Sequence, residues 1–240
     1  MYQNYIFDLY GTLVDTHTNE NKSYLHQKLA AMYASYGAFY TPKEWKSEYQ
    51  RLCREKKAAR ENPHFEIELT EVFAELFTNK GIQVSKDTVL AVANMFRVVS
   101  RDYLKLYDFV LPFFGHLKKK GKGIYLLSNA QTCFTVPEIK ALKLYDLFDG
   151  IVISSEVGVC KPDTRIMDEL ITKYHLDKSR CIMIGNDRTS DIRIAIDSGL
   201  DSLYMHSNIS PQITEEYEQT KATYEVLDGD FSRIEQLILL

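Results

Sequence analysis

The chain has 240 residues, of which 45% are hydrophobic and 26% charged, and its formal net charge is -4. This is the size and composition of one large or two modest globular domains, and the negative charge argues against a nucleic-acid partner. No apolar stretch suits a membrane span, the first residues do not resemble a signal peptide, and the scattered cysteines fit neither a zinc site nor a disulfide framework. We therefore expect a cytoplasmic protein with reduced thiols.

The first predicted element is a buried strand over residues 5–7, because these residues are aromatic or β-branched. Asp8 follows at the expected carboxyl end of the strand, which is the edge of a parallel α/β sheet where ligands bind. A carboxylate there can act as a nucleophile, as a metal ligand or as both. Taken alone, the stretch is equally typical of a strand followed by a polar turn.

Residues 17–107 have helical periodicity without strand signals, and we predict four amphipathic helices there. Thr41-Pro42 with Glu44 is a typical start for the second helix, as is Ser85 for the fourth. The expected apolar faces, in chain order, are Leu25, Leu29, Met32, Tyr33 and Tyr36, then Trp45, Tyr49, Leu52 and Cys53, then Phe65, Leu69, Val72, Phe73 and Leu76, then Val89, Val92, Phe96, Val99 and Tyr103. Together they predict a helical bundle whose aromatic residues form its core.

Beyond Leu111-Pro112 strand patterns alternate with helical ones, which is typical of right-handed βαβ crossovers and a parallel sheet. Strands are predicted over 123–127, 150–153, 180–184 and 202–205, and helices over 135–144, 163–174 and 190–198. An edge strand over 222–226 and a closing helix over 231–239 would complete the fold. The strand at residues 5–7 would join this sheet, which makes the helical segment an insertion.

Each later strand is also followed by polar residues. Ser128-Asn129 can bind an anionic oxygen. Lys161-Pro162 predicts a helix start with the lysine at its positive end, although a surface lysine is the alternative. The segment Gly185–Asp191 suits Mg²⁺, or else Thr189 or Ser190 simply caps the next helix.

Taken in order, these stretches resemble the four motifs of the haloacid dehalogenase superfamily of aspartate-nucleophile hydrolases. The matching segments are Asp8 to Thr12, Ser128, Lys161, and Gly185 to Asp191. The resemblance implies a doubly wound parallel α/β sheet as the catalytic core, over residues 1–15 and 108–240, and an inserted α-helical cap domain over residues 16–107.

The resemblance also implies a mechanism in which Asp8 attacks phosphorus and forms an aspartyl intermediate. Thr12 and Ser128 would bind oxygens of the transferring group, and Lys161 would neutralise the charge. Gly11 and Asn129 would contact the substrate, and the cap would exclude water.

The metal implied by the resemblance is Mg²⁺, held by Asp8, the backbone carbonyl of Tyr10 and the last motif. An ungapped match places Asn186 on the primary ligand position, whereas a shorter acidic spacing uses Asp187 and Asp191. Both possibilities remain open from the sequence.

Tyr10 departs from the phosphatases of the superfamily, which usually carry an aspartate there as the general acid. The superfamily's 2-haloacid dehalogenases do have tyrosine at this position, need no acid because halide leaves unprotonated, and dispense with metal. Three hypotheses follow: a Mg²⁺-dependent phosphohydrolase of a small phosphorylated metabolite, which we favour, a metal-independent 2-haloacid dehalogenase, and a catalytically weak phospho-ligand binding protein. We expect a small-molecule substrate, no nucleic acid or membrane partner, and a monomer or homodimer.

Overall fold

The central feature of the fold is a six-stranded sheet in which every pair of neighbouring strands is parallel. The computed structural model describes residues 1–212, 220–230 and 232–239. In the order β5-β4-β1-β6-β7-β8, the strands are Gly150–Ile153, Gly123–Ser128, Asn4–Phe7, Cys181–Gly185, Asp201–Met205 and Tyr224–Val226. The first strand of the chain therefore lies between β4 and β6, in the middle of the sheet.

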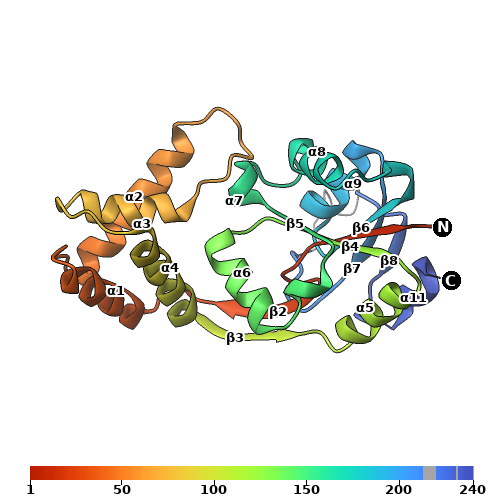
Figure 1. Ribbon diagram of the computed structural model, residues 1–240, viewed down its shortest axis with the longest axis horizontal. Coiled ribbons are helices and arrows are strands. Elements are labelled where there is room, and N and C mark those ends of the chain that lie inside the picture. Colours follow the sequence, from red (N-terminus) through yellow and green to blue (C-terminus); the bar gives the residue numbers. More distant parts are fainter. Residues whose placement is uncertain (213–219, 231, 240) are drawn as a thin grey trace.

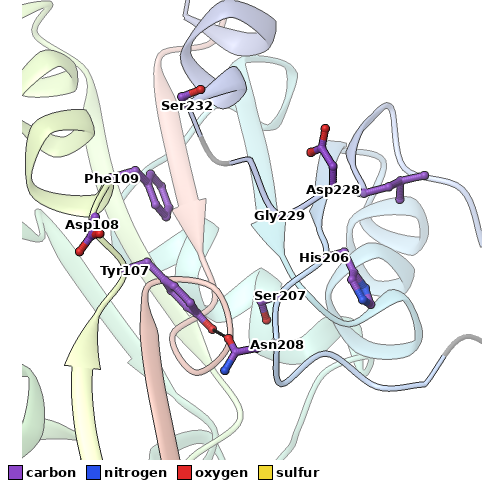
Figure 2. A pocket seen from close by; sticks show the side chains of 10 residues that line it. Tyr107, Asp108, Phe109, His206, Ser207, Asn208, Asp228, Gly229 and Ser232 are labelled. Carbon is purple, nitrogen blue, oxygen red and sulfur yellow. Dashed lines mark hydrogen bonds between the residues drawn. The ribbon is translucent and has the colours of Figure 1, made fainter.

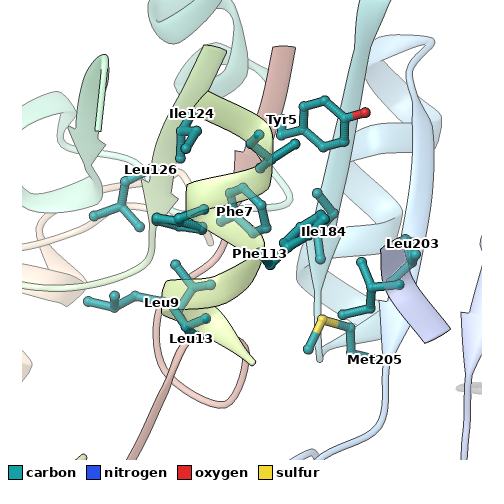
Figure 3. Packing of buried hydrophobic residues seen from close by; sticks show 14 of the residues in the cluster. Tyr5, Phe7, Leu9, Leu13, Phe113, Ile124, Leu126, Ile184, Leu203 and Met205 are labelled. Carbon is teal, nitrogen blue, oxygen red and sulfur yellow. The ribbon is translucent and has the colours of Figure 1, made fainter. Parts of the chain in front are cut away.

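Helices cover both faces of this sheet, as the predicted fold class requires (Figure 1). Successive side chains of β1 point to opposite faces, so Tyr5 and Phe7 pack with Phe113 of α5 (Val110–Lys119), as Figure 3 shows. Ile6 joins a separate cluster on the other face, with Met167 of α8 (Thr164–Lys173). The doubly wound α/β fold predicted from the sequence is thus confirmed.

Three further predicted helices lie close to their expected positions. They are α6 (Thr132–Ala141), a π-helical turn η3 (Arg188–Ile192) that continues into α9 (Arg193–Ser198), and α11 (Arg233–Ile238). Helix α7 (Ser154–Val157) and short 3-10 turns at Tyr145–Leu147 and Lys178–Arg180 were not predicted. The predicted edge strand over 222–226 is confirmed as β8. Phe231, at the start of the predicted closing helix, lies outside the described residues.

Four helices form a separate group to one side of the sheet (Figure 1). They are α1 (Ser23–Ser35), α2 (Pro42–Ala58), α3 (Leu69–Thr78) and α4 (Lys86–Ser100). The capping box predicted for α2 is confirmed, because Thr41 Oγ1 accepts from Glu44 N at 3.2 Å and Glu44 Oε2 from Thr41 N at 2.7 Å. Most of the predicted aromatic residues are buried between these helices as a core, as expected, whereas Tyr36, at the end of α1, is 43% exposed.

The prediction that residues 17–107 contain no strand is wrong. Strand β2 (Val14–Thr18) pairs antiparallel with β3 (Arg101–Leu106), and this ribbon joins the four-helix group to the sheet (Figure 1). Helix α4 ends at Ser100, so Tyr103 does not face inward from a helix: its side chain is 40% exposed, and its hydroxyl donates to Asp15 at 3.0 Å. Phe65 likewise precedes α3 and forms an isolated bridge with Val159.

Removing an aromatic side chain from the four-helix core should cost much of the stability. Phe73 is fully buried, and its ring centroid lies 5.5 Å from that of Phe96. We expect Phe73→Ala to lower the free energy of unfolding by about 3–5 kcal/mol. Val98→Ala, on a side chain that is 60% exposed, should change it by no more than about 0.5 kcal/mol. Urea unfolding with equal midpoints for the two variants would contradict this packing.

Candidate active site

Three of the predicted motifs converge because they lie at the ends of neighbouring strands of one parallel sheet. Asp8 comes directly after β1, Ser128 ends β4, and Gly185 ends β6. The main chain holds Asp8 in place, since its N–H donates to the carbonyl of Ile184 at 2.9 Å. The Asp8 side chain is nearly buried, with 8% of the residue exposed. The predicted motifs therefore gather at the carboxyl edge of the sheet, where ligands of such sheets bind.

Lys161 forms ion pairs with two carboxylates at this edge. Its Nζ lies 2.7 Å from Asp8 Oδ1 and 2.7 Å from Asp191 Oδ1, and it donates to the carbonyl of Leu127 at 2.8 Å. Burial disfavours the charged ammonium, yet the two carboxylates outweigh this effect and raise the pKa of Lys161. The lysine is therefore positively charged and fixes one oxygen of Asp8.

The position of Lys161 has a different origin from the predicted one. Helix α8 begins at Thr164, and its N-cap is Asp163, whose side chain accepts from Arg165 N at 3.0 Å, so Pro162 does not occupy the first helical position. The Lys161-Pro162 peptide bond is cis. Asn129 holds the segment instead: its amide oxygen accepts from Lys161 N at 2.7 Å, and its amide nitrogen donates to Lys161 O at 3.0 Å.

The acidic residues of the last motif are already engaged within the protein. Asp191 Oδ2 accepts from the N–H groups of Asn186 and Asp187, both at 3.1 Å. Burial raises the pKa of the Asp191 carboxyl, and Lys161 opposes this effect. Asp187 Oδ1 accepts from Thr189 N at 2.8 Å, so Asp187, rather than Thr189 or Ser190, caps the helical turn η3.

Asp8, Asp187 and Asp191 all line one cavity at this edge of the sheet. Within the ranges that the structure covers, no group of three His, Cys, Asp or Glu side chains is arranged to hold a metal ion. The predicted use of all three as ligands of one Mg²⁺ therefore gains no support from the geometry.

Asn186 is the member of this motif that lies beside Asp8. Its Oδ1 accepts from Thr12 Oγ1 at 3.3 Å, and the same hydroxyl lies 3.5 Å from Asp8 Oδ2. Gly11 makes this approach possible, because a Cβ there would come within 2.2 Å of Asn186 Nδ2. The φ of Gly11 is +87°, which also favours glycine. Ser210 supports Asn186 from the other side, accepting from its Nδ2 at 3.2 Å.

The hydroxyl groups of Ser128 and Tyr10 differ in their hydrogen-bond partners. Ser128 Oγ is buried and has no hydrogen-bond partner among the residues that the structure describes. Tyr10, by contrast, donates its hydroxyl to Glu138 Oε2 at 2.5 Å and contacts Thr135 Oγ1 at 3.2 Å. Burial and the nearby Glu138 carboxylate raise the pKa of Tyr10. Sequence reasoning missed Glu138, because nothing in the helix predicted over 135–144 distinguished it from a surface glutamate.

A cavity of about 230 Å³ lies over these residues, lined by Asp8, Tyr10, Asn129 and Lys161 among others. A larger cavity of about 540 Å³ lies between α2 and the loop after β4, and Ala130, next to Asn129, lines it. A third, of about 630 Å³, lies beyond β7 and β8, and contains none of the predicted site residues. Figure 2 shows its lining, where Tyr107 donates to Asn208 at 2.6 Å.

Strand β1 of the parallel sheet is followed by an aspartate that is paired with a buried lysine. This arrangement is typical of α/β proteins whose reaction takes place at a carboxylate. The match to a family model, which extends over residues 2–199, makes the assignment specific. The chain belongs to the haloacid dehalogenase-like hydrolases. The resemblance noted in the sequence is thereby confirmed.

Curated relatives with sequence similarity are phosphatases. Glyceraldehyde 3-phosphate phosphatase of Methanothermobacter thermautotrophicus is 28% identical over 122 residues, which are 51% of this chain and 54% of that protein. Pyrimidine 5'-nucleotidase YjjG of Escherichia coli is 33% identical over 86 residues, which are 35% of this chain and 38% of that protein. The chain spans about half the length of the curated relatives it matches.

Solved structures with the same fold include both kinds of enzyme. A 2-haloacid dehalogenase from Pseudomonas syringae aligns with a TM-score of 0.68 at 18% identity, covering 98% of this chain and 97% of that one. A HAD phosphatase from Thermococcus onnurineus aligns with a TM-score of 0.59 at 15% identity, covering 98% and 96%. These likenesses establish the fold and do not select a reaction. In the part of the chain that the structure covers, no helix has the length and apolar character of a membrane span.

The contact between Gly185 and Asp191 offers a direct test of the site's packing. A Cβ at Gly185 would lie 2.3 Å from Asp191 Cβ, whereas one at Gly115, within α5, would meet no atom within 4 Å. We expect Gly185→Ala to displace Asp191 from Lys161 and to lower the melting temperature by several degrees, as a loss of about 1–3 kcal/mol from overpacking would. Gly115→Ala should leave it unchanged or raise it. A thermal scan in which both variants match the wild type would contradict this contact.

Proposed function

We propose that the chain is a phosphoric monoester hydrolase in which Asp8 is the nucleophile. One observation carries the proposal: Asp8 lines the cavity with Oδ1 bound to Lys161, while Oδ2 lies 3.5 Å from the hydroxyl of Thr12. In the first step an Asp8 oxygen bonds to phosphorus as the bond to the leaving oxygen breaks. Water then attacks the phosphorus of the aspartyl phosphate, which releases inorganic phosphate and restores the carboxylate.

The donors around Asp8 are suited to a phosphoryl group. Thr12 and Ser128 supply hydroxyls, and Lys161 supplies a fixed positive charge that stabilises the added charge of the transition state. The unsatisfied hydroxyl of Ser128 supports this assignment, because a buried polar group without a partner requires an explanation. A substrate oxygen would provide the missing partner.

Leaving-group chemistry follows from Tyr10. Its hydroxyl is bonded to Glu138, and its raised pKa makes it a poor proton donor at neutral pH. General acid catalysis contributes about 10²–10⁴ in rate. We therefore propose aryl or acyl phosphates as the favoured substrate class, because their leaving groups depart without a proton.

The residues beside Asp8 fit a weakly held Mg²⁺. Its ligands would be the Asp8 carboxylate, the main-chain carbonyl of Tyr10 and the amide oxygen of Asn186, which shares the Thr12 hydroxyl with Asp8. When bound, the ion would offset negative charge on the phosphoryl oxygens. Because an amide replaces a carboxylate at this position, we expect lower affinity than three acidic ligands would give.

We also propose that α1–α4 act as the predicted cap over residues 16–107, with the core at 1–15 and 108–240. The cavity between α2 and Ala130 supports this, because Ala130 directly follows Asn129, which lines the nucleophile's cavity. A leaving group would extend into it.

Haloacid dehalogenation is the second candidate, and two residues favour it. Tyr10 supplies no acid and Asn186 no acidic ligand, and this reaction needs neither. Asp8 would attack the carbon that bears the halogen, halide would leave with the bonding electrons, and water would hydrolyse the resulting ester.

Parallel assays decide between the two reactions. We would measure hydrolysis of p-nitrophenyl phosphate and acetyl phosphate, with Mg²⁺ and with a chelator, and halide release from 2-chloropropionate. Phosphate release that depends on Mg²⁺ supports the proposal, whereas halide release that is unaffected by the chelator overturns it in favour of the second candidate. If neither occurs, the phospho-ligand binding hypothesis replaces both.

Replacing the nucleophile should abolish turnover without unfolding the protein. Asp8→Asn keeps the shape of the side chain but cannot form the covalent intermediate, so we expect a loss of at least about a thousandfold in kcat. Circular dichroism should confirm that the variant is folded. Turnover near the wild-type rate in such a preparation would exclude the aspartyl mechanism.

Introducing an acidic ligand at position 186 should strengthen the binding of Mg²⁺. We expect Asn186→Asp to tighten Mg²⁺ binding by at least about tenfold, or about 1.4 kcal/mol, in isothermal titration calorimetry. Asn94→Asp, at an exposed position on α4, adds the same charge away from the site and should leave the affinity unchanged. Equal affinities for the two variants would mean that Asn186 is not at the metal position.

A further inference from the structure

A buried polar network beneath the nucleophile turn joins three elements that are distant in sequence. Its centre is Glu138 of α6, of which 3% is exposed. Besides Tyr10, Glu138 binds two arginines: Arg97 of α4 donates from Nε at 2.6 Å and from a second nitrogen at 3.2 Å, and Arg101 of β3 donates at 2.7 Å. The carboxylate thus links the turn after β1 with both ends of the α4–β3 connection.

Arg97 also packs against two aromatic rings. The Arg97 guanidinium lies 5.3 Å from the ring centroid of Tyr10 and 5.6 Å from that of Phe134. Tyr10 therefore contacts Arg97 through its ring face and Glu138 through its hydroxyl. A buried carboxylate depends strongly on such partners, and the loss of Glu138 itself would leave Tyr10 and both arginines without the partner they share.

Tyr10 lies within the turn that carries the site. Gly11 N donates to Val14 O at 2.8 Å, and Leu13 N donates to Leu9 O at 2.8 Å, so the turn is short and tightly bonded. Holding the Tyr10 side chain consequently restrains the backbone on which Asp8 and Thr12 lie.

We propose that Glu138 is a positioning residue: through Tyr10 it fixes the nucleophile turn, and through Arg97 and Arg101 it fixes the four-helix group relative to that turn. Tyrosine at position 10 then has a role of its own, as the link between the turn and Glu138. The proposal rests on the proposed function only where rates are concerned, because the contacts themselves can be tested without substrate.

The first test is hydrogen exchange of backbone amides in the wild type, Glu138→Gln, Tyr10→Phe and Glu169→Gln. Glu138→Gln should raise exchange at least about fivefold both in residues 11–14 and at the end of α4. Tyr10→Phe, which removes a single hydroxyl and should fold normally, should raise it in residues 11–14 alone. Glu169→Gln, at an exposed position on α8, should match the wild type. Unchanged exchange in residues 11–14 of both Glu138→Gln and Tyr10→Phe overturns the proposal, whatever the enzyme's substrate.

The second test is a double-mutant cycle on kcat for whichever substrate the parallel assays identify. If Tyr10 and Glu138 act as one unit, each single variant should lose about tenfold in kcat with little change in KM. The double variant should then lose about tenfold as well, rather than a hundredfold. Independent, multiplicative losses would overturn the link, while the activity of the wild type would still support the proposed function.

Discussion

The ion pairs of Lys161 with Asp8 and Asp191 are the interaction on which the rest of the site depends. Three ionisable groups are held together at the carboxyl edge of the sheet, and each is nearly or fully buried. Such charges persist in a protein interior only when they are paired and hydrogen-bonded. The backbone amides of the last motif bond Asp191, and the carbonyl of Leu127 accepts from Lys161 Nζ, while Asn129 holds the main chain of Lys161. Backbone groups of the surrounding loops therefore serve as hydrogen-bond partners of these buried charged side chains.

The balance of these charges bears on the chemistry. Two carboxylates and one ammonium leave an excess of one negative charge when all three are ionised, and this excess disfavours the approach of a phosphate dianion. A cation near Asn186 would reverse that balance, which is a physical reason for coupling phosphate chemistry to Mg²⁺. A neutral carbon centre meets less of this repulsion, which is why the dehalogenase reaction remains the natural competitor.

Most of the fold could be predicted from the sequence, because the periodicity of hydrophobic residues and the polar residues after each strand are local signals. The buried strand before Asp8 and the later alternation of strands and helices determine the parallel sheet, and thereby bring Asp8, Ser128 and Gly185 together. The β2–β3 ribbon could not be predicted in this way, because Arg101–Leu106 becomes a strand only through its pairing with Val14–Thr18, which lies far away in sequence.

The details of the site were less predictable, because competing local bonds decide them. Pro162 is a plausible helix start, but α8 begins two residues later, at Thr164, with the Asp163 side chain as its cap. Asp187 also caps η3, which the sequence did not indicate, while its use as a metal ligand stays a prediction. Glu138 carried no local signal at all, since its partners come from three other segments of the chain.

The buried hydroxyl of Ser128 has a consequence for binding energy. Folding has already removed this donor from water, at a cost of about 1–3 kcal/mol for a polar group without a partner. A ligand oxygen that reaches Ser128 therefore does not have to strip solvent from it, and the new hydrogen bond contributes nearly its full strength in a dry environment. Because the hydroxyl is buried, that gain is available only to a ligand oxygen that reaches it. The unpaired hydroxyl of Ser128 thus lowers the stability of the free protein and favours ligands that make this contact.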